Sequence, residues 1–214
     1  MLISITEAVP RAAQALADGK PVVLPLPTPL PYAIFGIGPG IVNGAKGRPA
    51  DQPTGIVIAD IAAVTPFLDV TPASLVEWLS VAEGLNLFVP LVADAPNWLI
   101  GHEGKVGLMG AWLPQLREIL DTAGHLYVSS GNRTGATPAI TAAEADAAFG
   151  ELLVVDGDVH RDEKVVHGSS SIIEISSTGD LRLARSGVQD QAFGDGEAFL
   201  ADLRTRWSQR RLSA

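Results

Sequence analysis

The chain has 214 residues, of which 47% are hydrophobic and 18% charged, and its net charge at pH 7 is -9. This length and apolar content suffice for one sizeable core, and no apolar run approaches the roughly 20 residues that a membrane-spanning helix needs. The acidic balance disfavours a nucleic-acid platform, which normally requires a basic face. Because the chain has no Cys, disulfides and thiol catalysis are excluded.

Two further inferences concern the ends of the chain. Residues 1–7 lack the basic start and the small-residue cleavage site of a secretory signal, which predicts a cytoplasmic protein. Residues 204–214 carry four Arg and no acid, a pattern that suits the solvated, negative end of a helix better than an RNA contact. We expect a single domain over residues 1–190 and a helical, basic tail over residues 191–214.

The predicted elements alternate between helices and strands along the chain. Apolar periodicity and turn residues predict, in order, a helix over 6–18, strands over 22–24 and 55–59, a helix that opens at Thr71-Pro72 and a strand over 87–92. They then predict a helix over 114–121, a strand over 126–128, a helix from the capping box Thr141–Glu144 to about Gly150, an apolar segment over 152–155, and strands over 171–175 and 181–184. The alternation favours a layered α/β fold. The last two strands form a predicted hairpin, which makes the sheet mixed.

Two polar clusters, far apart in the sequence, predict half of an anion-binding pocket. Lys46 and Arg48 flank a glycine, so the backbone can approach a polyphosphate while both side chains reach the same ligand. Residues 129–135, with the sequence SSGNRTG, supply hydroxyl and amide donors on a loop that also contains glycine.

Several other chemistries are excluded by residue spacing. Lys46 follows Ala45 and precedes Gly47, so the glycine-rich segment before it is not a Walker loop, which needs Gly before the Lys and Ser or Thr after it. The four His include no i, i+4 pair, and we expect no metal ligated by protein side chains. The serines at 169–171 lack the Gly-x-Ser-x-Gly elbow of a hydrolase.

Four blocks occur in an order that resembles the YrdC/YciO family. They are Lys46-Gly47-Arg48-Pro49, Ser130-Gly131-Asn132-Arg133-Thr134-Gly135, Gly168-Ser169-Ser170-Ser171 before an apolar strand, and Arg185-Ser186-Gly187. The resemblance covers the chain from about residue 20 to residue 190. It implies an α/β, three-layer YrdC/RibB-like fold, in which a twisted mixed β-sheet is flanked by helices around a concave cavity.

The best-known activity in that family is threonylcarbamoyl-adenylate synthase, which serves tRNA modification. Threonine and bicarbonate form a carbamate, which attacks the α-phosphate of ATP and releases pyrophosphate; Mg²⁺ would accompany the ATP. Positioning and charge neutralisation are sufficient machinery for such a reaction. The resemblance gives Lys46 and Arg48 a catalytic role and places them in the nucleotide site with four other residues: Ser130, Asn132, Ser170 and Arg185.

On the substrate side the resemblance points to Thr28, Tyr32, Phe35 and Ser171, but there the chain departs from the family pattern. The usual Pro-Thr-Asp-Thr-Val-Tyr-Gly-Leu-Gly segment is replaced by residues 27–38, which lack the Asp-Thr pair, and a customary Arg is Met109. Two alternatives therefore stay open. One is a divergent YciO-like nucleotide-binding protein with altered or lost acceptor specificity. The other is a double-stranded RNA-binding module of the translation apparatus, against which the acidic charge counts.

Overall fold

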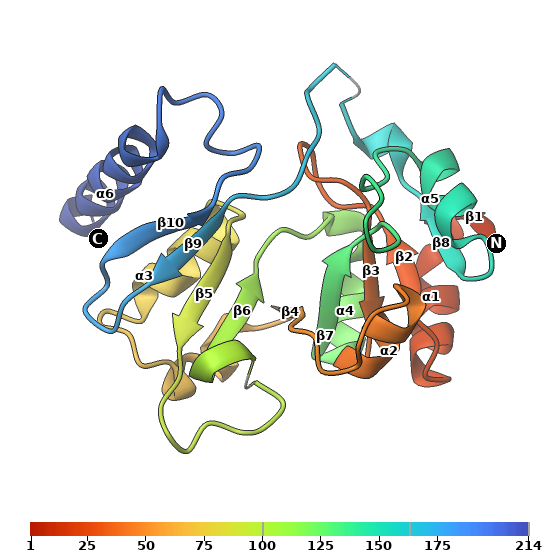
Figure 1. The fold of residues 1–214 in the computed structure, drawn as a ribbon, viewed down its shortest axis with the longest axis horizontal. Coiled ribbons are helices and arrows are strands. Elements are labelled where there is room, and N and C mark those ends of the chain that lie inside the picture. Colours follow the sequence, from red (N-terminus) through yellow and green to blue (C-terminus); the bar gives the residue numbers. More distant parts are fainter. Residues whose placement is uncertain (100, 163, 214) are drawn as a thin grey trace.

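The computed structural model describes residues 1–99, 101–162 and 164–213 (Figure 1). A ten-stranded mixed sheet runs through the molecule in the order β1-β8-β2-β3-β7-β4-β6-β5-β9-β10. The strands are β1 (Leu2–Ser4), β2 (Val22–Leu24), β3 (Ala33–Gly36), β4 (Gly55–Ile58), β5 (Asn86–Pro90), β6 (Lys105–Met109), β7 (His125–Ser130), β8 (Leu153–Asp156), β9 (Ile172–Ile175) and β10 (Leu181–Arg185).

Helices flank this sheet, as the sequence predicts. The α-helices are α1 (Ala8–Ala17), α2 (Pro39–Ala45), α3 (Ser74–Glu77), which continues as a π-helix over Trp78–Ala82, α4 (Arg117–Ala123), α5 (Ala142–Phe149) and α6 (Gly196–Ser213). Single 3-10 turns cover Ile5–Glu7, Ile61–Ala63, Thr65–Phe67, His102–Gly104, Pro114–Leu116 and Asp158–His160. The predicted α/β class with a mixed sheet is confirmed.

Two local predictions are confirmed in detail. The Thr141 hydroxyl accepts a hydrogen bond from the Glu144 backbone amide at 3.2 Å, and the Glu144 carboxylate accepts one from the Thr141 amide at 3.3 Å. This capping box satisfies amides that the first turn of α5 would otherwise leave without partners. Strands β9 and β10 pair antiparallel, with Ile175 opposite Leu181, and form the predicted hairpin.

The sheet is buried on both faces, and successive residues of one strand pack on opposite sides of it. In β3, Ile34 belongs to the hydrophobic cluster that includes residues of α5 and α6, whereas Phe35 belongs to the cluster that includes residues of α1 and α4. Alternation of this kind follows from the two-residue period of a strand. It produces three layers, with helices on each side of the sheet (Figure 1).

Helix α6 packs part of its length into the core, while Arg204, Arg210 and Arg211 near its end are exposed. Phe199, Leu200 and Leu203 are buried in the same cluster as residues of β5, β9 and β10, and Trp207 contacts Trp78 with ring centroids 5.4 Å apart. The helix therefore completes the core on this side of the sheet. No helix within the described part of the chain is both long and apolar enough to cross a membrane.

Candidate functional site

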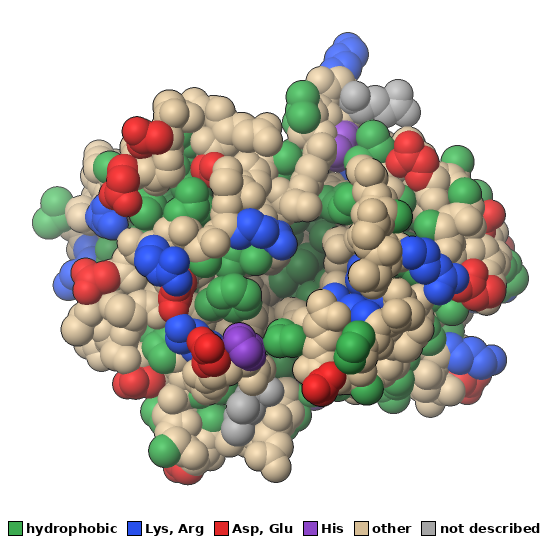
Figure 2. Space-filling view, viewed as in Figure 1, with side chains coloured by type: hydrophobic (Ala, Val, Ile, Leu, Met, Phe, Trp, Pro, Cys, Tyr) green, Lys and Arg blue, Asp and Glu red, His purple; other side chains and the backbone are tan. Residues whose placement is uncertain are grey.

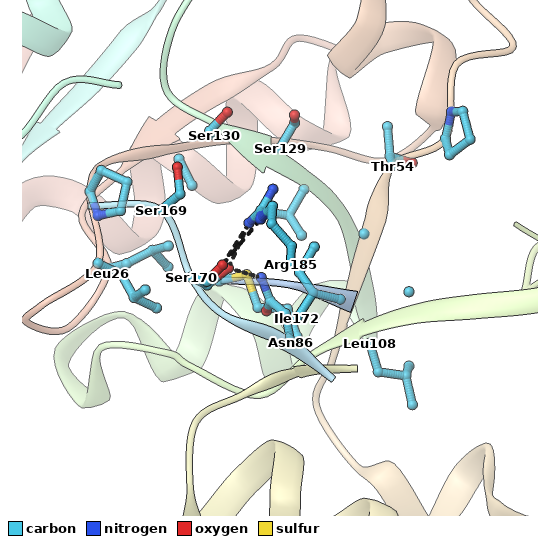
Figure 3. A pocket seen from close by; sticks show the side chains of 18 of the residues that line it. Leu26, Thr54, Asn86, Leu108, Ser129, Ser130, Ser169, Ser170, Ile172 and Arg185 are labelled. Carbon is cyan, nitrogen blue, oxygen red and sulfur yellow. Dashed lines mark hydrogen bonds between the residues drawn. The ribbon is translucent and has the colours of Figure 1, made fainter. Parts of the chain in front are cut away.

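A cavity of about 300 Å³ lies between the part of the sheet that contains β3 and β7 and the part that contains β6, β5 and β9 (Figures 2 and 3). Its walls come from β3, β5, β6, β7 and the segments around β4, β9 and β10. The lining residues are Leu26, Leu30, Pro31, Tyr32, Ala33, Arg48, Pro53, Thr54, Gly55, Asn86, Leu87, Phe88, Gly107, Leu108, Met109, Val128, Ser129, Ser130, Ser169, Ser170, Ile172 and Arg185. Among these described residues are two arginines and no Asp or Glu. A concave site with only positive side-chain charges attracts anions.

Arg185 enters the cavity from the end of β10. Its Nη2 and Nε atoms donate to the Ser170 carbonyl oxygen at 2.8 and 3.2 Å, and Nη2 also lies 3.2 Å from the Ser170 hydroxyl oxygen. Asn86, on β5, donates from Nδ2 to the same hydroxyl oxygen (Figure 3). Burial lowers the pKa of Arg185 from its ordinary value, yet a guanidinium stays protonated in proteins. These contacts hold a positive charge at one wall of the cavity.

Arg48 supplies the second positive charge, from the loop between α2 and β4. Its Nε atom donates to Oδ1 of Asn43 at 2.6 Å. Asn43 is fully buried and donates in turn to the carbonyls of Ala50 and Gln52, so it fixes the loop around the arginine. The Nη2 atom of Arg48 is buried without a hydrogen-bond partner among the described residues. An unpaired buried donor is costly, and an anion in the cavity would satisfy it.

Lys46 lies behind the wall of the cavity, whereas the sequence predicts that Lys46 and Arg48 reach the same ligand. Its side chain is 4% exposed, and its ammonium donates to the carbonyl oxygens of Ser130 and Asn132, the latter at 2.7 Å, and to Oδ1 of Asn132 at 3.2 Å. Burial, together with the charge of Arg48, lowers the pKa of Lys46 to about 8. The structure thus brings the two predicted polar clusters together, and Lys46 joins them.

The loop after β7 carries the hydroxyls of the second cluster to the cavity. Ser129 and Ser130 line it, whereas Asn132 lies behind them and contacts Lys46. Between them, the Gly131 amide donates to the Tyr32 carbonyl at 2.8 Å, and a Cβ atom at position 131 would lie 2.7 Å from that oxygen. A side chain here would push the loop away from β3.

Ser171, which the sequence predicts to contact a substrate, is fully buried and lies outside the lining of the cavity. Its hydroxyl donates to the carboxylate of Asp190, which also accepts from the Ser186 hydroxyl at 2.6 Å and from the Gly187 amide at 2.7 Å. Burial alone would raise the pKa of Asp190, but these hydrogen bonds outweigh it and lower the pKa below its ordinary value.

Close backbone packing around Gly187 explains why the Arg-x-Gly block ends in glycine. A Cβ atom at this position would lie 2.2 Å from the Ser171 amide nitrogen and 2.3 Å from the Ser170 carbonyl carbon. The close approach brings the segment after β10 against the segment before β9, where Arg185 reaches Ser170. The sequence did not predict the role of Asp190, which accepts hydrogen bonds from both segments. Nor did it predict the roles of Asn43 and Asn86.

The remaining predicted substrate residues occupy three different environments. Tyr32 lines the cavity, and its hydroxyl donates to Asp158 at 2.7 Å; burial and this hydrogen bond raise the pKa of Tyr32 above its ordinary value. Phe35 is fully buried and meets Trp112 edge-on at 5.1 Å on the face covered by α1 and α4, so it does not line the cavity, where the sequence predicts a substrate contact.

Thr28 is also absent from the lining of the cavity. Its hydroxyl oxygen accepts a hydrogen bond from the Asp162 amide at 3.0 Å. The side chain therefore ties the loop before β3 to the segment after β8, away from the cavity at which the sequence predicts a substrate contact.

Fold and cavity together define an α/β protein with a mixed sheet and a cavity whose described lining carries two arginines and no carboxylate. The family model Sua5/YciO/YrdC, described as "Telomere recombination", matches residues 42–187, well over half of the chain. The chain belongs to this family, which confirms the resemblance seen in the sequence. A search of curated proteins found no significant match.

Solved structures show the same fold at low sequence identity. Sua5 of P. abyssi, in complex with L-threonine, has a TM-score of 0.69 and 20% identity, and the match covers 91% of this chain and 61% of that chain. YciO of E. coli has a TM-score of 0.66 and 14% identity, with 88% and 96% covered. Full-length HypF in a phosphate- and nucleotide-bound form has a TM-score of 0.65 and 15% identity, with 86% and 29% covered. The chain thus corresponds to less than two thirds of the Sua5 structure.

Proposed function

We propose that the cavity binds ATP and that the chain performs a reaction of the threonylcarbamoyl-adenylate synthase type, for tRNA modification. The observation that carries this proposal is the pair Arg48 and Arg185, which approach one cavity from separate segments with no Asp or Glu in the described lining. Membership of the Sua5/YciO/YrdC family supports it. So do the L-threonine in a structure of Sua5 and the nucleotide in a structure of HypF.

In the proposed reaction, an oxygen of the carbamate made from threonine and bicarbonate attacks the α-phosphorus of ATP. The new O–P bond forms as the bond from the α-phosphorus to the bridging oxygen breaks, and that electron pair leaves with pyrophosphate. Arg48 offers a buried guanidinium donor that has no partner among the described residues, and Arg185 offers a second cation. Both would stabilise the charge that develops on the departing oxygens.

Mg²⁺ is expected to enter as part of the ATP complex. The part of the chain that the structure describes holds no group of three or more His, Cys, Asp or Glu that could bind a metal ion. Phosphate oxygens and water are the usual Mg²⁺ ligands in nucleotide sites, so the cavity needs no carboxylate for this ion. Bicarbonate and threonine complete the proposed set of small-molecule partners.

A second candidate is a divergent nucleotide-binding protein with altered or lost acceptor specificity. The specific observation in its favour is Met109, which lines the cavity at the position where the family resemblance leads us to expect Arg. Leu30, from the segment 27–38 where the chain departs from the family pattern, lines the cavity as well, and so does Leu26 just before it. This part of the wall offers apolar contact where a charged acceptor would need polar partners.

One experiment separates the two candidates. Purified protein is incubated with ATP, Mg²⁺ and bicarbonate, and pyrophosphate release is compared with and without threonine, while ATP affinity is measured by calorimetry. Threonine-dependent release supports the synthase. ATP binding without such release favours the divergent binder, and absence of ATP binding contradicts both.

A further inference from the structure

Asn43 is a fully buried polar residue of α2 that contacts Arg48 and lies outside the lining of the cavity. We infer that Asn43 is a positioning residue: it holds the guanidinium of Arg48 so that the terminal nitrogens meet an anion, and it acts on the ligand only through Arg48. This inference rests on the proposed function, in which the anion is a phosphate group of ATP.

Asn43 holds Arg48 at both ends of the arginine side chain. The Arg48 backbone amide donates to the Asn43 carbonyl oxygen at 3.1 Å, and Nε of Arg48 donates to Oδ1 of Asn43 at 2.6 Å. Gly47, which precedes Arg48, has a φ of 66°, a left-handed conformation that lets the chain turn back onto α2. A free arginine samples many rotamers, and their loss opposes binding. Here the side chain is ordered on folding, before a ligand arrives.

The same side chain holds the loop that leads from Arg48 to β4. Nδ2 of Asn43 donates to the carbonyl oxygens of Ala50 and Gln52 at 2.9 and 2.8 Å, so both of its hydrogens are used. Residues 49–53 are exposed to solvent, and these two hydrogen bonds hold them from within. Among side chains of this size, only Asn accepts from a guanidinium and donates twice, because Asp has no donor at neutral pH.

Because Asn43 is neutral, the charge of Arg48 stays available to a ligand. Arg48 takes part in no ion pair among the described residues. Burial lowers the pKa of Arg48 from its ordinary value, yet the guanidinium stays protonated. An arginine that serves only the fold is commonly paired with a carboxylate when it is buried. A neutral amide instead fixes the direction of Arg48 and leaves its positive charge uncompensated.

The contact with Asn43 also determines which edge of the guanidinium a ligand meets. Since Nε is engaged, the donors left for a ligand are those of Nη1 and Nη2. Nη2 is buried without a partner in the described structure, and Arg48 lines the cavity. The two terminal nitrogens form one edge of the planar group and can donate to two oxygens of a single phosphate. We therefore expect Arg48 to bind a phosphate end-on.

The test is a double-mutant cycle on the whole chain. Inorganic pyrophosphate and, separately, ATP with Mg²⁺ are titrated by calorimetry into the native chain, Asn43→Ala, Arg48→Gln and the double variant. We expect Asn43→Ala to weaken pyrophosphate binding about tenfold in the native background, because Arg48 regains its rotamers, and less than about threefold in the Arg48→Gln background. Equal losses in both backgrounds would mean that Asn43 acts through the loop and not through Arg48. That result, or native affinity in Asn43→Ala, overturns the inference.

A second variant of equal size separates charge from shape. Asn43→Asp keeps an acceptor for Nε of Arg48, but it removes both donors and pairs the positive charge, so we expect it to weaken pyrophosphate binding at least about tenfold. Asn97→Asp adds the same charge at an exposed position outside the lining and should leave the affinity unchanged. Urea unfolding verifies that each variant is folded, and Asn43→Asp decides if Asn43→Ala is not. Native affinity in folded Asn43→Asp would contradict the role of a neutral anchor.

The two probes distinguish failure of this inference from failure of the proposed function. If the native chain binds pyrophosphate and not ATP, the nucleotide site is refuted, and the cycle with pyrophosphate still decides the role of Asn43. If ATP binds and the cycle shows no coupling between Asn43 and Arg48, the nucleotide site stands and the positioning role fails. If neither probe binds, both are refuted.

Discussion

The hydroxyl of Ser171 donates to the carboxylate of Asp190, and this buried contact joins the segment before β9 to the segment after β10. Ser170 lies on the first segment and Arg185 ends β10, directly before the second, so the contact determines where the cationic wall of the cavity lies. Three donors converge on Asp190 from outside its own peptide unit. Such an arrangement stabilises the ionised carboxylate.

Replacing this carboxylate should reduce stability. We expect Asp190→Asn to lower the free energy of unfolding by about 1.5–3 kcal/mol, the usual value of a hydrogen bond to a charged group, because an amide presents a donor to groups that are themselves donors. Urea unfolding at pH 7 measures the change. Asp94→Asn, at an exposed position, is the matched control and should change stability little.

The contribution of Asp190 should also depend on pH. Its pKa in the folded state is lowered from the ordinary 3.8, so the folded protein binds fewer protons than the unfolded chain in acid, and stability falls as pH falls. The difference between the native chain and Asp190→Asn is expected to be constant above about pH 5 and to shrink below about pH 4. Urea unfolding from pH 7 to pH 3 checks this. A difference that is independent of pH would show that Asp190 is not the titrating group.

Lys46 is expected to act on the loop rather than directly on a ligand. Lys46→Met removes the buried ammonium that donates to the carbonyl oxygens of Ser130 and Asn132, which should lower the free energy of unfolding by about 1–3 kcal/mol. Thermal or urea unfolding measures this, with the exposed Lys20→Met as the control. If Lys46→Met weakens nucleotide binding while stability stays native, the ammonium contacts the ligand after all.

Gly187 should not tolerate even a methyl group. Gly187→Ala would place Cβ 2.2 Å from a backbone nitrogen, and we expect a loss of at least about 1–3 kcal/mol, since backbone must move to relieve the overlap. Gly194→Ala is the matched control, because nothing lies within 4 Å of a Cβ atom there. Comparable stability of the two variants would mean that the segments are not packed as described.

We expect Arg185 to contribute more to ATP affinity than Arg182, a second arginine on β10. Arg185→Gln is expected to weaken ATP binding at least tenfold, equivalent to the loss of one charge-assisted contact of about 1.5–3 kcal/mol. Arg182, also on β10, pairs with Glu174 outside the lining, so Arg182→Gln should leave the affinity unchanged. Calorimetry on both variants decides; equal affinities would remove Arg185 from the nucleotide site.

Elements with a strong local pattern could be predicted from the sequence, including the three-residue β2, whereas β1 and β3 could not. The capping box at Thr141 and Glu144 marks the start of α5 through contacts within one turn. By contrast, β1 has three residues and pairs with β8, about 150 positions later, so its strand character comes from a distant partner. Strand β3 follows a proline-rich segment, which masks the apolar run 33–36 that pairs with β2 and β7.

The segments that form the site could be predicted from the sequence, but the directions of their side chains could not. Glycine-flanked polar blocks indicated the segments around Arg48, Ser130 and Arg185, and the structure places all three in one cavity. Spacing along a loop does not fix where side chains point, so the different directions of Lys46 and Arg48 were not predictable. Asp190 carries no local signal, because its role arises where two distant segments meet.

The packing of α6 has a consequence for how the chain folds during its synthesis. Phe199, Leu200 and Leu203 complete the cluster that also contains residues of β5, β9 and β10, and Trp207 covers Trp78. A growing chain that has reached only residue 190 would leave this apolar surface in contact with water. The half of the sheet that carries Arg185 therefore reaches its final packing only after α6 has been made and has docked.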